Sequence, residues 1–208
     1  MRKILFAAIL MACSSVAAFA QTTSDDYDKV NVFAGFSHNR VDTGIDNDDP
    51  ELDDIFDERE GFNGFNVSVA GNVSRYVGLK FDYSFHQKSF DFGADSTDFR
   101  LHNFLGGVQV KDNSKEGGRA RPFAHFLVGA ARASADLTEF DDTLEDVSET
   151  GLAFGIGGGL DVRVNDRLDV RAIQFDYNPT RFSLNNGVIN NNTETLHNFR
   201  IGVGIVIK

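Results

Sequence analysis

Histidine and serine are the side chains of this sequence that could act together as base and nucleophile. A hydrolase site needs a serine beside a histidine whose ring a third polar group orients. Ser84 and His86 share one face of an extended segment, whereas Ser37 and His38 are adjacent and point in opposite directions. Neither pair meets the requirement, so we predict no catalytic residues and no enzyme. We expect all five histidines in structural positions: His38, His86, His102, His125 and His197.

Carboxylates gather in two segments, and oxygen ligands at such density could hold a divalent cation. Their spacing lacks the pattern and the central glycine of an EF-hand, so a solvated acidic loop is favoured and no metal site is predicted. The first segment contains Asp42, Asp46, Asp48, Asp49, Glu51, Asp53, Asp54, Asp57, Glu58 and Glu60, and the second contains Asp136, Glu139, Asp141, Asp142, Glu145, Asp146 and Glu149.

Two further features exclude classes of ligand. The stretch from Gly155 to Gly159 is rich in glycine, but Leu160 and the lack of a following helical pattern exclude a dinucleotide fingerprint. The net charge of −11 argues against nucleic acid as a partner. No cofactor is therefore predicted.

The chain begins with the layout of a secretory signal peptide. Arg2 and Lys3 precede an apolar run, and Ala18-Phe19-Ala20 matches a small-x-small cleavage pattern. We predict a signal peptide over residues 1–20 and one domain over residues 21–208. The single cysteine lies in the predicted signal peptide, so the exported chain must be held together without disulfides, for example by a closed sheet.

Eight segments alternate between apolar and small or polar residues, which is the period of a β-strand. Val77 to Phe85 shows the pattern most simply, with an apolar residue at every odd position. After residue 20, no apolar run approaches the roughly 18 residues of a spanning helix. The predicted strands cover residues 29–39, 64–74, 77–86, 99–111, 122–132, 150–164, 167–177 and 196–207.

Two of the predicted strands change parity along their length. In the fourth, the apolar residues Leu101 and Phe104 fall on opposite parities, which predicts a β-bulge near Asn103. In the seventh, Leu168 in the first half and Ile173 in the second half also differ in parity.

Short and long connections alternate between the predicted strands. Two residues join the second strand to the third and the sixth to the seventh, whereas the segments 39–64, 87–98, 133–149 and 178–195 are long. This layout is typical of membrane barrels, which have short turns on one side and long loops on the other. Strands of about 11 residues tilted by about 40° would cover an apolar band of about 25 Å.

The side on which the apolar face lies decides between two kinds of barrel. A soluble barrel turns that face inward around a ligand, whereas a membrane barrel turns it outward to lipid. The opposite face is small in the sixth strand, at Gly155, Gly157 and Gly159, as the narrow interior of an eight-stranded membrane barrel requires. On the inner face of the strands, we predict a cluster of charged side chains in the lumen: Lys80, Asp82, Asp161, Arg163, Asp176 and Arg200. Ion pairs that fill the lumen are favoured over a conducting pore.

The last strand carries a pattern that resembles the outer-membrane insertion signal. Arg200 and Gly202 precede two alternating apolar positions, Ile205 and Ile207. Lys208 departs from the pattern, because such proteins usually end in an aromatic residue.

Residues 28–208 resemble the small OmpA-type outer-membrane β-barrel family, whose members carry an outer membrane protein beta-barrel domain. The stretches Pro122 to Gly129 and Gly157 to Arg163 carry the resemblance, together with the signal peptide, the eight strands and the last strand. The resemblance implies an all-β fold, an eight-stranded antiparallel up-and-down transmembrane β-barrel in the outer membrane of a Gram-negative bacterium. It implies outer-membrane lipid, lipopolysaccharide and the barrel-assembly machinery as partners.

The predicted function combines these features. We predict a non-enzymatic outer-membrane protein with a structural or surface-interaction role through its long acidic loops, and a surface partner for those loops. Divalent cations that bridge the loops to lipopolysaccharide stay an open alternative. Three different functions also stay open: a small ion-permeable pore, a soluble periplasmic lipocalin-like ligand-binding barrel and a lipid-modifying enzyme.

Overall fold

The computed structural model describes residues 26–42, 59–92, 95–139, 142–183 and 193–208. The predicted signal peptide and most of the first acidic segment lie outside these residues. No helix long and apolar enough to cross a membrane occurs in the described part of the chain. The strands are β1 (Val30–Asp42), β2 (Arg59–Asn72), β3 (Val77–Phe92), β4 (Asp95–Lys111), β5 (Ala120–Glu139), β6 (Asp142–Asn165), β7 (Leu168–Ser183) and β8 (Thr193–Ile207).

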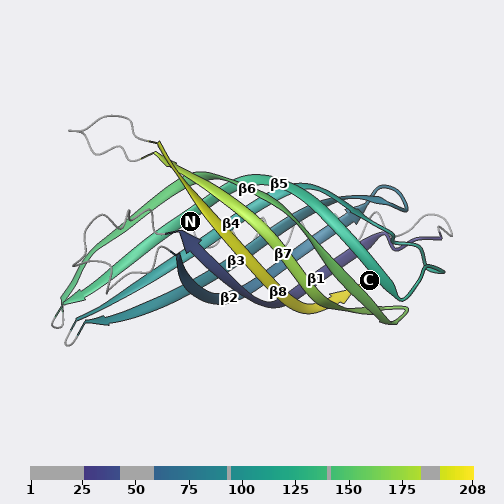
Figure 1. The fold of residues 1–208 in the computed structure, drawn as a ribbon, viewed down its shortest axis with the longest axis horizontal. Coiled ribbons are helices and arrows are strands. Elements are labelled where there is room, and N and C mark those ends of the chain that lie inside the picture. The colour runs from purple at the N-terminus through teal and green to yellow at the C-terminus, as the bar shows by residue number, and fades with distance from the viewer. Residues whose placement is uncertain (1–25, 43–58, 93–94, 140–141, 184–192) are drawn as a thin grey trace, which may run out of the picture.

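The eight strands form one closed antiparallel barrel (Figure 1). Each strand pairs with the next along the chain, and β8 returns to pair with β1, from Val32 opposite Ile207 to Arg40 opposite Phe199. Closure gives every strand a partner on both sides. The predicted all-β, eight-stranded up-and-down antiparallel architecture is confirmed.

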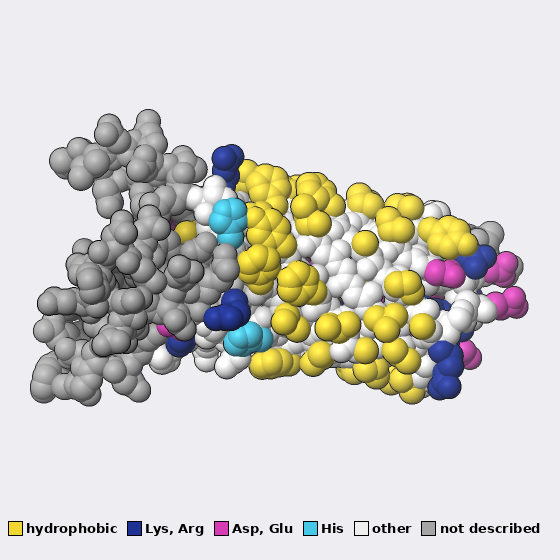
Figure 2. Space-filling view, viewed as in Figure 1, with side chains coloured by type: hydrophobic (Ala, Val, Ile, Leu, Met, Phe, Trp, Pro, Cys, Tyr) yellow, Lys and Arg dark blue, Asp and Glu magenta, His cyan; other side chains and the backbone are white. Residues whose placement is uncertain are grey.

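The apolar face of the strands is the outer face of the barrel. In β3, Leu79 is 60% exposed and Phe81 is 54% exposed, whereas Lys80 and Asp82 beside them are buried. Figure 2 shows apolar side chains in a band around the visible surface, with charged side chains at both edges of the band. The alternative of a soluble barrel around an apolar ligand is therefore wrong, because the apolar face of the strands points outward and the charged residues lie inside.

The two ends of the barrel differ in their connections. We call the end with the connections at residues 73–76, 112–119 and 166–167 the turn end, and the opposite end the loop end. Two loops predicted at the loop end are wrong, because the strands continue through 87–98 and 133–149 and leave only residues 93–94 and 140–141 between them. Antiparallel pairing continues past the apolar band because each further residue pair can add backbone hydrogen bonds to the ladder.

The predicted bulge in β4 is wrong. The register of β4 with both neighbours runs without a shift, and Leu101 and Leu105 are buried inside the barrel while Phe104 is exposed outside. Apolar residues of both parities occur because part of the interior is apolar. The parity change in β7 has a different cause, a register shift between Arg171 and Gln174.

The small residues of β6 leave room for side chains from other strands. A β-carbon at Gly157 would lie 2.0 Å from a carboxylate oxygen of Asp176, and one at Gly159 would lie 2.9 Å from the ring of Phe123. The interior is thus filled by long side chains that reach across to glycine. Phe33, the exception to the alternation in β1, is one of these fillers and stacks on the guanidinium of Arg171.

Candidate functional site: the charged lumen

The centre of the lumen is organised around the guanidinium of Arg200 on β8. It lies 3.0 Å from a carboxylate oxygen of Asp82, and its Nε and Nη2 donate to Asp176 at 2.8 and 2.5 Å. Lys80 lies 3.1 Å from Asp82, and the Nε2 of His125 lies 3.0 Å from Asp176. All five side chains are buried. Buried charges are tolerated only when they are paired, and here each carboxylate faces two basic groups.

A second group of charges lies nearer the turn end. Asp161 accepts hydrogen bonds from the Nζ of Lys111 at 2.6 Å and from the Nε of Arg171 at 2.7 Å. Gln174 joins this group to the central one, because its carbonyl accepts from Arg171 and its amide donates to Asp176, both at 2.6 Å. The two groups therefore form one connected network of ions and hydrogen bonds.

Lys208 extends the same network to the mouth of the barrel. Its Nζ lies 2.7 Å from a carboxylate oxygen of Asp169 and 3.7 Å from Asp28, and Arg121 contacts the same two carboxylates at 3.5 and 3.3 Å. The side chains of Lys208 and Arg121 are almost fully buried. The residue that departs from the usual terminal aromatic thus has a place in the interior, where a positive charge has partners.

Toward the loop end, the charged side chains give way to an apolar cluster and to neutral polar side chains such as Ser84, His86 and Asn103. Leu105, Leu127, Ala131 and Ala153 are fully buried and Leu101 nearly so, and these residues pack as one cluster. The lumen thus contains a charged network at its turn end and centre and an apolar cluster, defined by these five residues, toward its loop end.

The structure places five of the six predicted lumen residues in the network: Lys80, Asp82, Asp161, Asp176 and Arg200. Arg163 does not join them. Its guanidinium donates to the carbonyls of Ser114 and Lys115 in the connection after β4, at 2.8 and 2.5 Å. Arg163 lies two residues beyond Asp161 toward the turn end of β6, and Arg121 of the network donates to the same Ser114 carbonyl.

Sequence reasoning missed several members of the network: Lys111, Arg121, Asp169, Arg171, Gln174 and Lys208. For β7 a signal existed, because a bulge at the parity change would have placed Asp169 and Arg171 on the inner face. Lys111 and Lys208 lie at the ends of β4 and β8. The alternating pattern continues on only one side of each, so it did not show whether these side chains point inward.

The histidines divide between the lumen and the outer surface. His125 belongs to the network, and the Nε2 of His86 lies 2.5 Å from the hydroxyl oxygen of Ser37 inside the barrel. On the outer surface, His102 and His197 form hydrogen bonds with the hydroxyls of Tyr83 and Tyr177. Figure 2 shows histidines at the loop-end edge of the apolar band. Such a place is typical of girdle residues, whose rings lie at the membrane interface.

Ser37 and His86 form a pair that sequence reasoning did not find, because they lie on different strands. Both side chains are fully buried, and among the described residues no carboxylate contacts the Nδ1 of His86. A nucleophile needs both access for a substrate and an oriented base, so this pair does not form an active site. The described residues also contain no cluster of carboxylates, histidines or cysteines that could hold a metal ion.

The residues of the predicted insertion signal lie on both faces of β8. Arg200 and Gly202 are buried, and Ile205 and Ile207 are exposed on the outer surface. Their role in insertion stays a prediction. Six residues of the predicted acidic loop lie outside the described residues: Asp46, Asp48, Asp49, Glu51, Asp53 and Asp54.

Known structures with the same fold are small outer-membrane proteins. Ail, the attachment invasion locus protein of Yersinia pestis, is 16% identical over 85% of this chain and 97% of its own, with a TM-score of 0.55. NspA, a neisserial surface protein, is 14% identical over 88% of this chain and 99% of its own, with a TM-score of 0.61. At these identities the likeness concerns the fold alone. No curated protein sequence matches this chain.

A sequence model of one family covers nearly the whole chain. It describes the outer membrane protein beta-barrel domain and matches residues 6–206. The outward apolar band, the closed eight-stranded sheet and the buried polar interior are the features that such a domain requires. The chain belongs to the outer membrane protein beta-barrel domain family.

Proposed function

We propose that this protein is a non-enzymatic, closed barrel with a structural or surface-interaction role through its acidic loops. The observation that supports this function is the filled lumen. A scaffold whose interior is occupied by its own side chains can act only through its outer surface and its ends. The predicted export by a signal peptide and the exposure of the loop end at the cell surface are part of the proposal.

The filled lumen disfavours the alternative of an ion-permeable pore. An ion that crossed the barrel would have to pass Arg200, whose contacts to Asp82 and Asp176 are 3.0 Å or shorter. It would then meet the part of the lumen that the apolar cluster and buried neutral side chains such as Ser84 and Asn103 fill. Side chains just fill the interior of an eight-stranded barrel, so we expect the protein to conduct no ions.

The acidic segments favour one chemical class of partner. The crystal structure of Ail holds sucrose octasulfate, a heparin analogue and a polyanion. The first acidic segment of this chain has one arginine among ten carboxylates, so it would repel such a ligand. We therefore propose a cationic partner, or an anionic surface that is reached through divalent cations.

The test replaces six carboxylates of the first acidic segment by amides: Asp46, Asp48, Asp49, Glu51, Asp53 and Asp54. Bacteria that carry the gene, the amide variant or a deletion are compared for adhesion to a cationic surface and for dye uptake through the outer membrane. A variant with the same segment in shuffled order is the control for net charge. Purified protein is tested in planar bilayers for single-channel conductance.

Each outcome has a separate meaning. Loss of adhesion in the amide variant with normal dye uptake supports a surface-interaction role. A structural role is supported if the deletion strain takes up more dye and expression of the amide variant restores normal uptake. Regular conductance steps from the unmodified protein would show a pore and contradict the proposal, as would a deletion that changes neither property.

A further inference from the structure

Three short motifs occur once in each half of the barrel. Phe-Ala-x-Phe occurs at residues 33–36 of β1 and 123–126 of β5. Phe-Asp-Tyr occurs at residues 81–83 of β3 and 175–177 of β7, and Leu-His-Asn-Phe occurs at residues 101–104 of β4 and 196–199 of β8. The motifs recur after 90, 94 and 95 residues, which is close to one period. Such a period is the mark of an internal repeat.

The strand register pairs equivalent residues in the same way in both halves. Asp82 lies opposite Leu105, and Asp176 lies opposite Arg200, which follow the two copies of the last motif directly. Where the halves meet, Phe126 of β5 lies opposite Val108, and Phe36 of β1 lies opposite the equivalent Val203. The register of β1 with β2 differs by two residues from that of β5 with β6. The barrel therefore has an approximate two-fold axis along its length.

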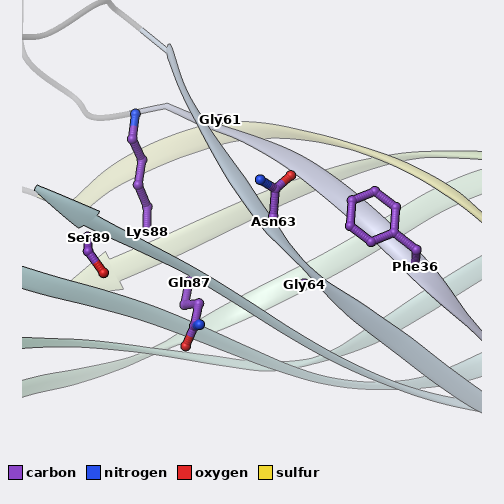
Figure 3. A pocket seen from close by; sticks show the side chains of 7 residues that line it. All are labelled: Phe36, Gly61, Asn63, Gly64, Gln87, Lys88 and Ser89. Atoms are coloured by element: carbon purple, nitrogen blue, oxygen red, sulfur yellow. The ribbon is translucent and has the colours of Figure 1, made fainter.

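Equivalent side chains also make equivalent contacts on the outer surface. The hydroxyl of Tyr83 lies 3.0 Å from the Nδ1 of His102, and the hydroxyl of Tyr177 lies 2.5 Å from the Nδ1 of His197. Phe36, which lines an open hollow on the outer surface (Figure 3), and its counterpart on β5 are both exposed. The outer surface thus follows the same approximate symmetry.

In the lumen, equivalent residues from the two halves hold one cation between them. The ring centroids of Phe33 and Phe123 both lie 4.1 Å from the guanidinium carbon of Arg171. Asp82 and Asp176 both contact the guanidinium of Arg200. A group that two symmetry-related residues contact in the same way lies near the axis that relates them.

The two halves differ most at the residue that follows the last motif. It is Arg200 in β8, whereas in β4 it is Leu105, which is fully buried and belongs to the apolar cluster. A second member of that cluster, Leu127, lies opposite Gly107, and its counterpart Ser37 lies opposite Gly202. The apolar cluster therefore occupies the place that polar residues beside Arg200 occupy in the other half.

We propose that the barrel is built from two copies of one four-stranded unit, so that positions 105 and 200 are equivalent sites for the one arginine that bridges the central carboxylates. Arg200 bonds Asp176, its partner in the strand pair, and reaches Asp82 across the lumen. An arginine at position 105 would bond Asp82 in its own strand pair and reach Asp176. Only one is kept, because a second guanidinium would add a buried charge without a further carboxylate.

The experiment exchanges the two residues in the full chain. Arg200→Leu, Leu105→Arg and the double variant with both changes are compared by the midpoint of urea unfolding in lipid vesicles and by the change of gel mobility on boiling. The matched control combines Arg200→Leu with Leu101→Arg, which places the arginine at another buried position of β4. It has the same composition, but Leu101 is not equivalent to residue 200.

We expect both single variants to unfold at lower urea than the unmodified protein, since each leaves a buried charge unpaired. The double variant should recover about half or more of the midpoint that Arg200→Leu loses, because its two changes compensate each other. If Arg200→Leu does not fold at all, folding of the double variant is the corresponding result. The Leu101→Arg control should recover nothing.

Two results would overturn the proposal. A double variant that is no more stable than Arg200→Leu, or that fails to fold, would mean that position 105 does not accept the arginine. Equal recovery in the Leu101→Arg control would mean that any inward arginine restores the charge balance, so that the two-fold relation has no part in it.

Discussion

The two parts of the lumen fill the same kind of space with opposite chemistry. The charged network around Arg200 and Asp161 consists of ion pairs, whereas the apolar cluster around Leu105 packs like the core of a soluble protein. Both fill the space between the strands with buried side chains. They differ in the stability that is lost when one member is removed. An unpaired buried charge costs more free energy than an apolar cavity of similar size.

The largest expected effect is that of Arg200→Met. The variant leaves Asp82 and Asp176 without their shared guanidinium, and removal of one partner from a buried ion pair costs about 3–5 kcal/mol. Urea unfolding in lipid vesicles, followed by circular dichroism because the chain has no tryptophan, measures the change. Arg181→Met at the exposed loop end is the matched control and should cost about 0.5 kcal/mol or less.

The triple variant Arg200→Met with Asp82→Asn and Asp176→Asn sharpens this prediction. It removes the uncompensated charges, so it should recover part of the stability that Arg200→Met loses. If Arg200→Met is no less stable than the Arg181→Met control, the network contributes nothing to the barrel.

The next effect is that of Leu105→Ala in the apolar cluster. Loss of a fully buried leucine leaves a cavity and should lower the free energy of unfolding by about 2–3 kcal/mol. Val108→Ala on the outer face of the same strand should cost less, because lipid fills the space that the side chain leaves. The comparison is contradicted if the outer substitution is the more damaging one in the same unfolding assay.

A smaller effect is expected at the mouth of the lumen. Lys208→Met removes one cation from Asp169, but Arg121 and Lys111 still lie within 3.6 Å of that carboxylate. We expect a loss of about 1 kcal/mol, the contribution of one hydrogen bond with partners that remain. Lys115→Met in the exposed connection after β4 is the control. A loss as large as that of Arg200→Met would show that the mouth, not the centre, holds the network together.

The smallest effect concerns Asp112 in the same connection at the turn end. Burial raises the pKa of its carboxyl, but hydrogen bonds from Arg75 and Ser114 outweigh this and lower the pKa to about 2. Because the folded pKa lies below the ordinary value of 3.8, the stabilisation is fully present above that pH and is lost as the pH falls toward 2. Arg75→Gln should raise this pKa in an NMR titration, whereas Arg167→Gln in another connection should not. An unchanged Asp112 titration in the Arg75 variant would rule out the contact in solution.

Much of the fold could be predicted from the sequence because strands in a closed barrel have two unlike faces. The alternation in Val77 to Phe85 and in Thr150 to Val164 indicated long two-faced strands, and eight such segments predicted the strand number and the antiparallel order. The glycines of β6 indicated which face lies inside, since only a narrow interior requires them. Strand ends were less predictable, because hydrogen-bonded pairing in β3 and β4 continues beyond the alternating pattern.

The site was only partly predictable for a related reason. Parity placed Lys80, Asp82 and Asp176 on the inner face, but it could not show which of them touch, because contacts across a lumen depend on the stagger between distant strands. The same stagger brings Ser37 to His86 and Lys208 to Asp169. The strand arrangement also explains why Leu101 and Leu105 point inward. Inside the barrel they pack against Leu127 and Ala153.

The sequence by itself determined that this chain forms a barrel with an apolar outer face and a polar inner one, because a period of two is a local property of extended backbone. The tertiary structure decided which charges pair, where the lumen turns apolar and where the outer surface is hollow. These properties depend on the register and closure of eight strands, and no local pattern along the chain records them.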